Sequence, residues 1–350
     1  MAVRFAFCPF RLLFKHTFET SHGSRDGTDS LFIRAEEGGQ AGYGEVTLPP
    51  YLHETIPGAI ERLLDWVPAQ RGTAEELLGR LEADPTAFQE APGLRAGLQM
   101  ALLDVRSRKL QVTVGQIYNI HDIKSPRVMM TLGVTPIPDL KERLLDLPHS
   151  TGLKLKVGDA QSLPRVRSVA MLDNRRLLLD GNQGFSTCEA VEELIGSQPR
   201  ARWIGIEQPF PPELDALNGV LAKRTGVVVI GDESIRTPAE LHAKRTHFGG
   251  VNVKLMKAGG LDRVASLVEQ ARHVGKLVML GSMSESSLGC TAMAHFSAAA
   301  DVVDLDGPWL IKNDPFEGIR MTTEGGLRMP TGSGIGASLT ADLSFNPIGA

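Results

Sequence analysis

The sequence predicts an α/β protein in which an eight-stranded parallel barrel follows a smaller α+β lobe. From about residue 126 onward, short apolar runs alternate with amphipathic segments, the pattern of parallel strands joined by helices. Eight such runs occur, which is the number of strands in a closed β/α barrel. The chain has 350 residues, enough for one large domain and a smaller one.

The smaller lobe is expected over residues 1–124. It begins with three apolar runs separated by turns, which is typical of a β-meander, and residues 54–117 then show helical periodicity. Residues 321–350 are rich in Gly and Thr, and we expect them to return to this lobe as loops and short strands.

The barrel is expected over residues 125–320. Three successive runs lead into carboxylates at Asp180, Glu207 and Asp232, separated by 27 and 25 residues, about one strand, one helix and two loops. Because the carboxyl ends of parallel strands meet at one rim, these side chains should lie together. Three oxygen ligands on neighbouring strands suit a hard cation such as Mg²⁺.

Lysines lie on either side of this acidic group in the strand order. Lys154 and Lys156 are two residues apart on the second run and therefore share a face, and Lys254 ends the sixth run. Strands 2 and 6 of an eight-stranded barrel face each other, so Lys156 and Lys254 should approach a central substrate from opposite sides. Lys257 should not share the strand face of Lys254 and is the weaker candidate for a base.

Such an arrangement suits removal of a proton next to a carboxylate. That proton is very weakly acidic, so the enediolate needs a cation and the base needs a lowered proton affinity. We expect Lys154 and Lys156 each to disfavour the charge of the other. Bases on two opposite sides allow a proton to leave one face and return to the other, which predicts a racemase or epimerase.

Each element alone has a simpler interpretation. Lysines at strand ends are usually solvated, and an acid after a buried strand, such as Asp232, is often a helix N-cap. Asp304 and Asp306, expected on one face of the eighth strand, could be loop residues before a Gly-Pro pair. These interpretations do not explain the ordered set of base, three acids and base, all at strand ends.

Composition argues against other classes of protein. The formal net charge is −4 without a basic stripe, so no nucleic-acid partner is expected. The three cysteines are far apart and form no CxxC pair. The apolar runs at the start of the chain are too short for a signal peptide or a membrane span, so we expect a cytoplasmic protein without a membrane partner. Whether copies assemble into a homo-oligomer is left open.

The motifs together resemble the muconate lactonizing subgroup of the enolase superfamily. They are Lys154-Leu155-Lys156, Asp180-Gly181-Asn182, Glu207-Gln208-Pro209, Asp232-Glu233-Ser234, and the segment from Asn252 to Lys257 with Gly259-Gly260. The resemblance implies a modified TIM barrel, (β/α)7β, with an α+β capping domain completed by the C-terminal segment. It also implies Lys156 and Lys254 as the acid/base pair, Lys154 as a supporting lysine, and the three carboxylates as ligands of one Mg²⁺ per subunit.

The segment from Asp304 to Pro308 resembles the DxD motif of dipeptide epimerases, in which two aspartates bind the α-ammonium of the substrate. The expected function is therefore a Mg²⁺-dependent dipeptide epimerase that inverts the α-carbon of the C-terminal residue through an enediolate. The alternatives are a muconate cycloisomerase or an o-succinylbenzoate synthase-like enzyme, and a catalytically silent barrel that binds amino-acid-like ligands.

Substrate specificity is expected to depend on loops at the barrel mouth. The resemblance implies a mobile loop from the capping lobe, expected at residues 20–28, and a second near 49–54. Arg25 in the first loop is a candidate substrate contact, with a solvated position as the alternative. Ser282 and Met283, after the seventh strand, are expected to shape the pocket. The sequence does not determine which dipeptide is bound.

Overall fold

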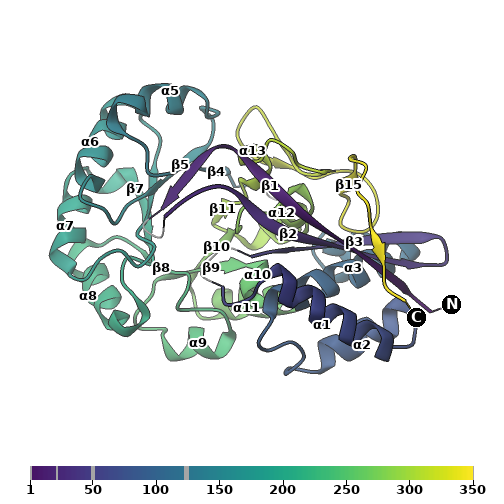
Figure 1. Ribbon diagram of the computed structural model, residues 1–350. Coiled ribbons are helices and arrows are strands. Elements are labelled where there is room, and N and C mark those ends of the chain that lie inside the picture. Colours follow the sequence, from purple (N-terminus) through teal and green to yellow (C-terminus); the bar gives the residue numbers. More distant parts are fainter. Residues whose placement is uncertain (1, 21–22, 49–51, 122–125, 350) are drawn as a thin grey trace.

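The computed structural model describes residues 2–20, 23–48, 52–121 and 126–349. Figure 1 shows a barrel with helices on its outside, and beside it a lobe that contains both chain termini. This confirms the predicted α/β class and the barrel with a capping lobe. The predicted boundary between residues 124 and 125 lies outside the described residues and stays a prediction. No helix in the described ranges has the length and apolar content needed to cross a membrane.

The capping lobe is built on an antiparallel sheet. Its strand order is β16-β1-β2-β3, and β16 brings the C-terminal segment back to pair with β1. Three helices follow β3 in the chain, and the second begins with a capping box in which Thr73 and Glu76 satisfy each other's backbone N–H groups. The bounds are β1 (Arg4–Thr20), β2 (Gly23–Glu37), β3 (Gln40–Thr47), β16 (Asn346–Pro347), α1 (Ile56–Ala69), α2 (Ala74–Ala83) and α3 (Pro92–Leu110).

Helix α3 is buried on nearly all sides because it lies between the capping sheet and the barrel. Its approach to β3 is so close that Gly44 has no room for a side chain: a Cβ there would lie 1.8 Å from the carbonyl oxygen of Gly97. On its other side, the buried Arg95 guanidinium reaches the barrel, with distances of 2.9 and 2.8 Å to the two carboxylate oxygens of Asp262. The helix therefore joins the two parts of the molecule.

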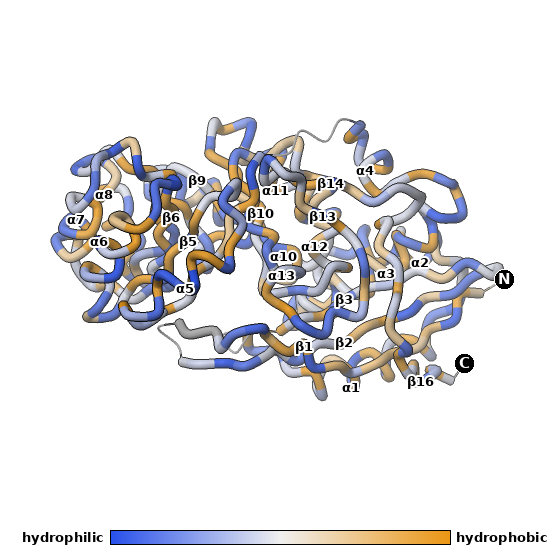
Figure 2. The backbone as a smooth tube through the Cα atoms, turned by 90° about the horizontal axis from the view of Figure 1, so that it is seen from above, coloured by the Kyte–Doolittle hydropathy of each residue, from blue (hydrophilic) through white to orange (hydrophobic). Residues whose placement is uncertain are grey.

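Strands β1 and β2 extend beyond the capping lobe as a hairpin arm toward the barrel (Figures 1 and 2). The prediction of a loop over residues 20–28 was wrong here, because Thr20 pairs with Gly23 and β2 already begins at Gly23. Small and polar residues in this segment suggested a loop, but backbone pairing makes it a strand. Residues 21–22, and residues 49–51 of the second predicted loop, lie outside the described residues.

The barrel contains the eight predicted parallel strands. They pair in chain order from β4 to β11, and a parallel bridge between Val128 and Val303 brings the first and last strands together. Their apolar residues appear as orange stretches inside the barrel in Figure 2. The bounds are β4 (Met129–Leu132), β5 (Gly152–Lys156), β6 (Leu177–Asp180), β7 (Trp203–Glu207), β8 (Val229–Gly231), β9 (Gly250–Lys254), β10 (Leu277–Gly281) and β11 (Val302–Asp304).

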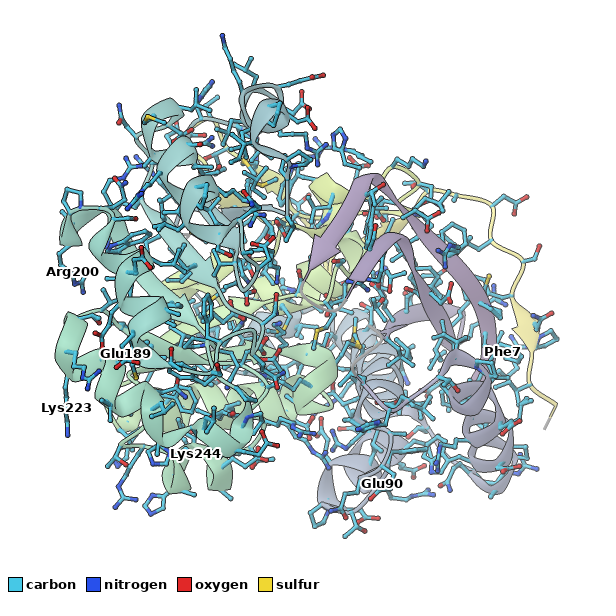
Figure 3. The ribbon with its side chains drawn as sticks, turned by 60° about the vertical axis from the view of Figure 1, so that its left-hand side comes forward. Phe7, Glu90, Glu189, Arg200, Lys223 and Lys244 are labelled. Carbon is cyan, nitrogen blue, oxygen red and sulfur yellow. The ribbon has the colours of Figure 1, made fainter. Side chains whose placement is uncertain are left out.

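Helices between the strands cover the barrel, and their outer faces carry charged side chains such as Glu189, Arg200 and Lys223 (Figure 3). The bounds of the helices between barrel strands are α5 (Leu140–Leu145), α6 (Ser162–Leu172), α7 (Cys188–Gly196), α8 (Ala216–Thr225), α9 (Pro238–Ala243), α10 (Leu255–Ala258), α11 (Leu261–His273) and α12 (Ser287–Ala294). The short helix α4 (Val114–Ile117) precedes the first barrel strand, and α13 (Gly307–Leu310) follows the last. The C-terminal segment adds two short antiparallel pairs, β12 (Phe316–Glu317) with β15 (Ser338–Leu339) and β13 (Arg320–Met321) with β14 (Leu327–Arg328).

Candidate active site

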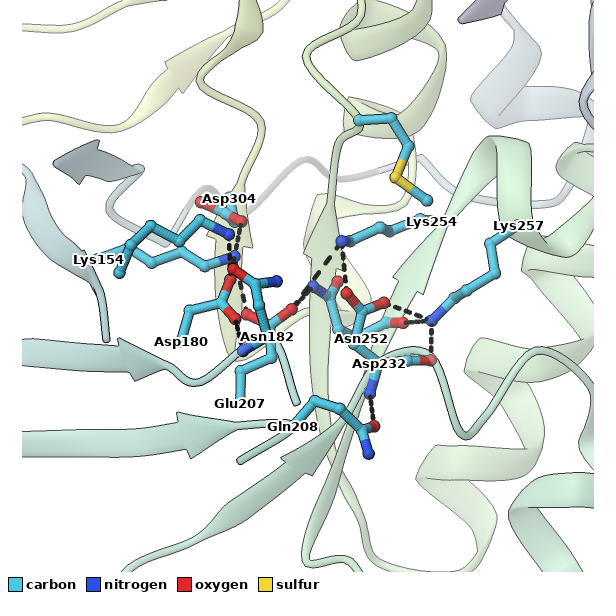
Figure 4. Close-up of polar contacts among 12 residues, drawn as sticks. Lys154, Asp180, Asn182, Glu207, Gln208, Asp232, Asn252, Lys254, Lys257 and Asp304 are labelled. Atoms are coloured by element: carbon cyan, nitrogen blue, oxygen red, sulfur yellow. Dashed lines mark hydrogen bonds and ion pairs between the residues drawn. The ribbon is translucent and has the colours of Figure 1, made fainter. Parts of the chain in front are cut away.

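The predicted lysines and carboxylates meet at the carboxyl ends of the barrel strands (Figure 4). In the register of the sheet, Lys156 lies beside Asp180, and Asp180 lies beside Glu207. Asp232 follows directly after β8, and Lys254 is the last residue of β9. All five side chains are buried, so the cluster is formed in the interior of the barrel mouth and not on the surface.

Lys154 contacts three carboxylates at once. Its Nζ lies 2.7 Å from Asp304 Oδ2, 2.7 Å from Glu207 Oε2 and 3.0 Å from Asp180 Oδ2. Burial opposes the charge of Lys154, but the three carboxylates outweigh burial and hold its pKa well above the usual value. The net shift in the pKa of Lys154 is therefore upward although Lys156 stands on the same strand face, because the nearby negative charges dominate.

Lys156 and Lys254 approach the acidic group from strands four positions apart in the eight-stranded sheet. Lys156 Nζ lies 2.5 Å from Asp180 Oδ2, and Lys254 Nζ lies 2.6 Å from Asp232 Oδ2. Lys254 Nζ is also 3.9 Å from Glu207 Oε1. The structure thus places one ammonium on each side of the carboxylates, which is the arrangement expected from the strand order.

The three carboxylates differ in their pKa. Burial alone would raise the pKa of Asp180, but Lys154 and Lys156 outweigh it and lower the value. The pKa of Asp232 is lowered against burial in the same way by Lys254 and a further lysine. Glu207 differs: burial, together with repulsion from Asp180, raises its pKa to about 7. A cation beside Glu207 would reduce that repulsion.

The further lysine is Lys257, which the strand pattern placed on another face. It does lie elsewhere, on α10, but its side chain returns to the cluster. Its Nζ is 2.7 Å from Asp232 Oδ1 and also donates to the carbonyl oxygens of Asp232 and Asn252. Burial lowers its pKa. Because it is bound on three sides, Lys257 fixes the position of Asp232.

Two amide side chains that stand in the sequence motifs, but for which no role was predicted, hold the carboxylates in place. Asn252 Nδ2 donates to Glu207 Oε1 at 2.7 Å, and Gln208 Oε1 accepts from the backbone N–H of Asp232 at 2.9 Å. Asn252 could have been found from its spacing, since it lies two residues before Lys254 on the same strand face. Nothing in its spacing distinguished Gln208, whose side chain bridges two strand ends.

The backbone is strained at this rim. Asn182, Gln183, Gln208 and Ser284 have φ values of 40°, 62°, 31° and 66°, a region that side-chain-bearing residues rarely adopt. All four follow barrel strands, directly or within a few residues, at the rim that holds the cluster. Strain of this kind costs free energy and persists where surrounding contacts enforce a geometry, often at functional sites.

The chemistry of the donor set fits a hard divalent cation. Asp180, Glu207 and Asp232 are buried carboxylates on adjacent strand ends, and the positive charge of Lys154 Nζ lies 2.7 Å from Glu207 Oε2. Within the described ranges, no three acidic, His or Cys side chains converge closely enough to hold a metal ion as they stand. The lysine ammonium groups lie between the carboxylates, so ion binding would require small side-chain movements.

The two aspartates of the DxD segment lie near Lys154 but differ from the expected placement. Asp304 ends β11, whereas Asp306 lies beyond the strand, with φ −86° and ψ 0°, at the start of α13. They therefore do not share a strand face. Asp306 Oδ2 accepts the backbone N–H of Thr131 at 2.7 Å, and burial next to Asp304 raises the pKa of Asp306 to about 7.

The remaining predicted residues lie around the mouth. Ser282 and Met283 follow β10, and the buried Met283 donates its backbone N–H to the carboxylate of Glu285. Arg25 lies in β2, where its guanidinium stands 5.8 Å from the centre of the Phe14 ring. Arg25 is thus part of the hairpin arm and not of a loop.

Comparison with known families identifies the barrel. Residues 140–343 match the family described as "Enolase C-terminal domain-like", which covers more than half of the chain. The chain belongs to this family. The match includes seven of the eight barrel strands and every lysine and carboxylate of the cluster.

Relatives and solved structures extend the similarity to the whole chain. The L-Ala-D/L-Glu epimerase of Bacteroides thetaiotaomicron is 29% identical over 324 residues, covering 91% of this chain and 84% of the relative. A hydrophobic dipeptide epimerase of Citrifermentans bemidjiense is 28% identical over 324 residues, covering 85% and 86%. The structure of a dipeptide epimerase from Cytophaga hutchinsonii, complexed with Mg and the dipeptide D-Ala-L-Val, covers all of both chains with a TM-score of 0.88 at 20% identity.

Proposed function

We propose that this protein is a Mg²⁺-dependent dipeptide epimerase that inverts the α-carbon of the C-terminal residue. The observation that carries the proposal is the placement of Lys156 and Lys254 on opposite sides of one buried acidic cluster. Enzymes that move a proton from one face of a carbon to the other need a base on each side. The names of the similar proteins support the same reaction.

Asp180, Glu207 and Asp232 would hold one Mg²⁺ per subunit, and the bound ion would stabilise negative charge on the carboxylate of the substrate. Asn252 and Lys257 orient Glu207 and Asp232 for this role. Lys156 and Lys254 would exchange the α-proton, one removing it and the other delivering a proton to the opposite face. Lys154 would remain charged, because three carboxylates surround it.

An amine-bearing substrate is favoured by the acceptors beside Lys154. Asp304 Oδ1 is buried and accepts no hydrogen bond within the described part of the chain. A buried oxygen without a donor costs about 1–3 kcal/mol. The α-ammonium of a dipeptide would supply that donor, whereas the substrates of a cycloisomerase or a succinylbenzoate synthase carry no free ammonium.

The proposal is tested by incubating the protein with a dipeptide library in D₂O. We expect deuterium to enter the α-carbon of the C-terminal residue and the two epimers to equilibrate, with Mg²⁺ required and EDTA abolishing both. If dipeptides bind but no deuterium enters across the library, the barrel is a binding protein and the proposal fails.

Asp304→Asn separates the proposal from the cycloisomerase and synthase alternatives. It should raise the KM for dipeptides strongly, because the ammonium loses a charged acceptor. Turnover of an amine-free substrate in the wild-type protein, with little effect of Asp304→Asn, would instead support those alternatives.

A further inference from the structure

A cavity of about 450 Å³ opens next to the aspartate pair. Thr131 lines it, and the backbone N–H of Thr131 donates to Asp306 Oδ2 at 2.7 Å. Trp309 also lines it, and its backbone N–H donates to the carbonyl oxygen of Asp306 at 2.9 Å. The cavity therefore lies next to Asp306, two residues from Asp304, where the proposed function places the α-ammonium of the substrate.

One wall of the cavity is formed by an interruption of the hairpin arm. Leu13 pairs with Gly27 and Phe18 with Arg25, so residues 14–17 of β1 leave the ladder and line the cavity. The wall is anchored to the chain beyond α13. Leu13 accepts a backbone hydrogen bond from Lys312 at 2.9 Å and donates its own N–H to Asn313 Oδ1 at 2.7 Å.

Apolar residues form half of the lining, and four residues with ionisable side chains, Lys15, His16, Arg143 and Asp146, also line the cavity. His16 Nε2 and Asp146 Oδ2 are 3.6 Å apart, with 50% and 54% of their side chains exposed, so they form part of the solvent-facing rim. The apolar lining consists of Phe14, Met130, Leu132, Leu147, Pro148, Trp309 and Leu310.

We propose that this cavity receives the side chain of the substrate's amino-terminal residue and selects dipeptides in which that residue is large and apolar. The inference rests on the proposed epimerase function and deepens it. The volume is within the usual range for small-molecule sites and would be poorly filled by the methyl group of alanine. Apolar and aromatic walls favour burial of an apolar side chain over a charged one.

The test compares dipeptides that differ only in the first residue. Deuterium exchange at the second residue is measured in D₂O with Mg²⁺ for Ala-, Leu-, Phe- and Glu-first dipeptides sharing each of several second residues. We expect kcat/KM to be at least about tenfold higher for Leu or Phe first than for Ala first, since a filled apolar pocket gains this much. Stabilisation against thermal unfolding by each dipeptide provides a second readout that does not depend on turnover.

Two variants test whether the preference for the first residue arises in the cavity. Leu147→Trp fills the cavity and should lower the ratio of Leu-first to Ala-first kcat/KM by about tenfold or more. Leu145→Trp is the control, because Leu145 is 65% exposed and does not line the cavity.

Equal or better turnover of Ala-first dipeptides, a preference for Glu first, or an unchanged ratio in Leu147→Trp would overturn the inference while leaving the epimerase function in place. Absence of exchange with every dipeptide would instead refute the function itself.

Discussion

Lys154 lies between three carboxylates, and this determines its role. A lysine beside Asp180, Glu207 and Asp304 is held charged, with its pKa well above the usual value. Such a group is unsuited to accept a proton near neutral pH. It is suited to neutralise buried carboxylates and to keep them in place, which leaves Lys156 and Lys254 as the candidate bases.

Removing either candidate base should therefore abolish inversion of the α-carbon while exchange of its proton with solvent continues. In Lys156→Ala or Lys254→Ala we expect epimerisation to fall by at least about a hundredfold, since one proton transfer loses its general acid or base. The remaining lysine should still exchange the α-proton of one epimer only, and that epimer should differ between the two variants. NMR of each pure epimer in D₂O measures this. Full epimerisation by either variant would contradict the two-base mechanism.

Glu285 makes stability depend on pH. Burial, with repulsion from Glu45, raises its pKa to about 8, whereas an unfolded Glu titrates near about 4.3. The folded state thus favours the protonated form. This contribution to stability is complete below the unfolded pKa and is lost as pH rises through about 8.

Glu285→Gln should remove that dependence. Between pH 5 and 8 the wild-type free energy of unfolding should decrease relative to the variant by up to about 1.4 kcal/mol per pH unit. Thermal or urea unfolding over this range measures the difference. Parallel pH profiles for the two proteins would show that Glu285 is not protonated in the fold.

Among the elements, α3 connects the capping sheet to the barrel helices α10 and α11. Arg95 makes this connection with almost no exposed surface, donating to the carbonyl oxygen of Gly259 at 2.6 Å as well as to Asp262. Gln99, one turn later, accepts the backbone N–H of Leu261 at 3.0 Å. These bonds satisfy groups at the start of α11 that would otherwise be buried without partners.

Arg95→Met should consequently destabilise the protein by about 3–5 kcal/mol, because Asp262 and the carbonyl groups lose a buried partner. Arg106→Ala is the matched control on the same helix. Arg106 lies 3.5 Å from the largely exposed Glu75, and such surface pairs contribute about 0–1 kcal/mol. Urea unfolding gives both values, and equal losses in the two variants would refute the assigned role of Arg95.

For the molecule as a whole, we expect Mg²⁺ binding to increase the free energy of unfolding. An ion that binds only the folded state stabilises it by about 2.7 kcal/mol at a hundredfold excess over its Kd. We expect Mg²⁺ to raise the melting temperature, EDTA to reverse this, and Glu207→Gln to abolish it. Glu189→Gln makes the same substitution on the exposed face of an outer helix and should respond as the wild type (Figure 3). An undiminished response in Glu207→Gln would place the ion elsewhere.

Prediction from the sequence succeeded where one residue's neighbours along the chain determine its environment. Asp180, Glu207 and Lys254 end apolar runs, and the ends of parallel strands share one rim, so their proximity followed from spacing. The hairpin arm was mistaken for a loop because its pairing is made by the backbone, which polar and small side chains do not reveal. Gln208 was missed because its partners lie on the next strand end.

The order of charged groups around the rim was determined by the sequence alone, since barrel topology turns chain order into strand order. The tertiary structure decided which groups meet. Barrel closure brings Asp304 to Lys154 across 150 positions and Asp306 to Thr131 across 175, and no local pattern encodes those contacts. It also decided the cavity beside Asp306, because its walls come from the hairpin arm, the end of β4, the segment around α5, and α13. Contacts between residues so far apart in the sequence form only when the whole chain has folded.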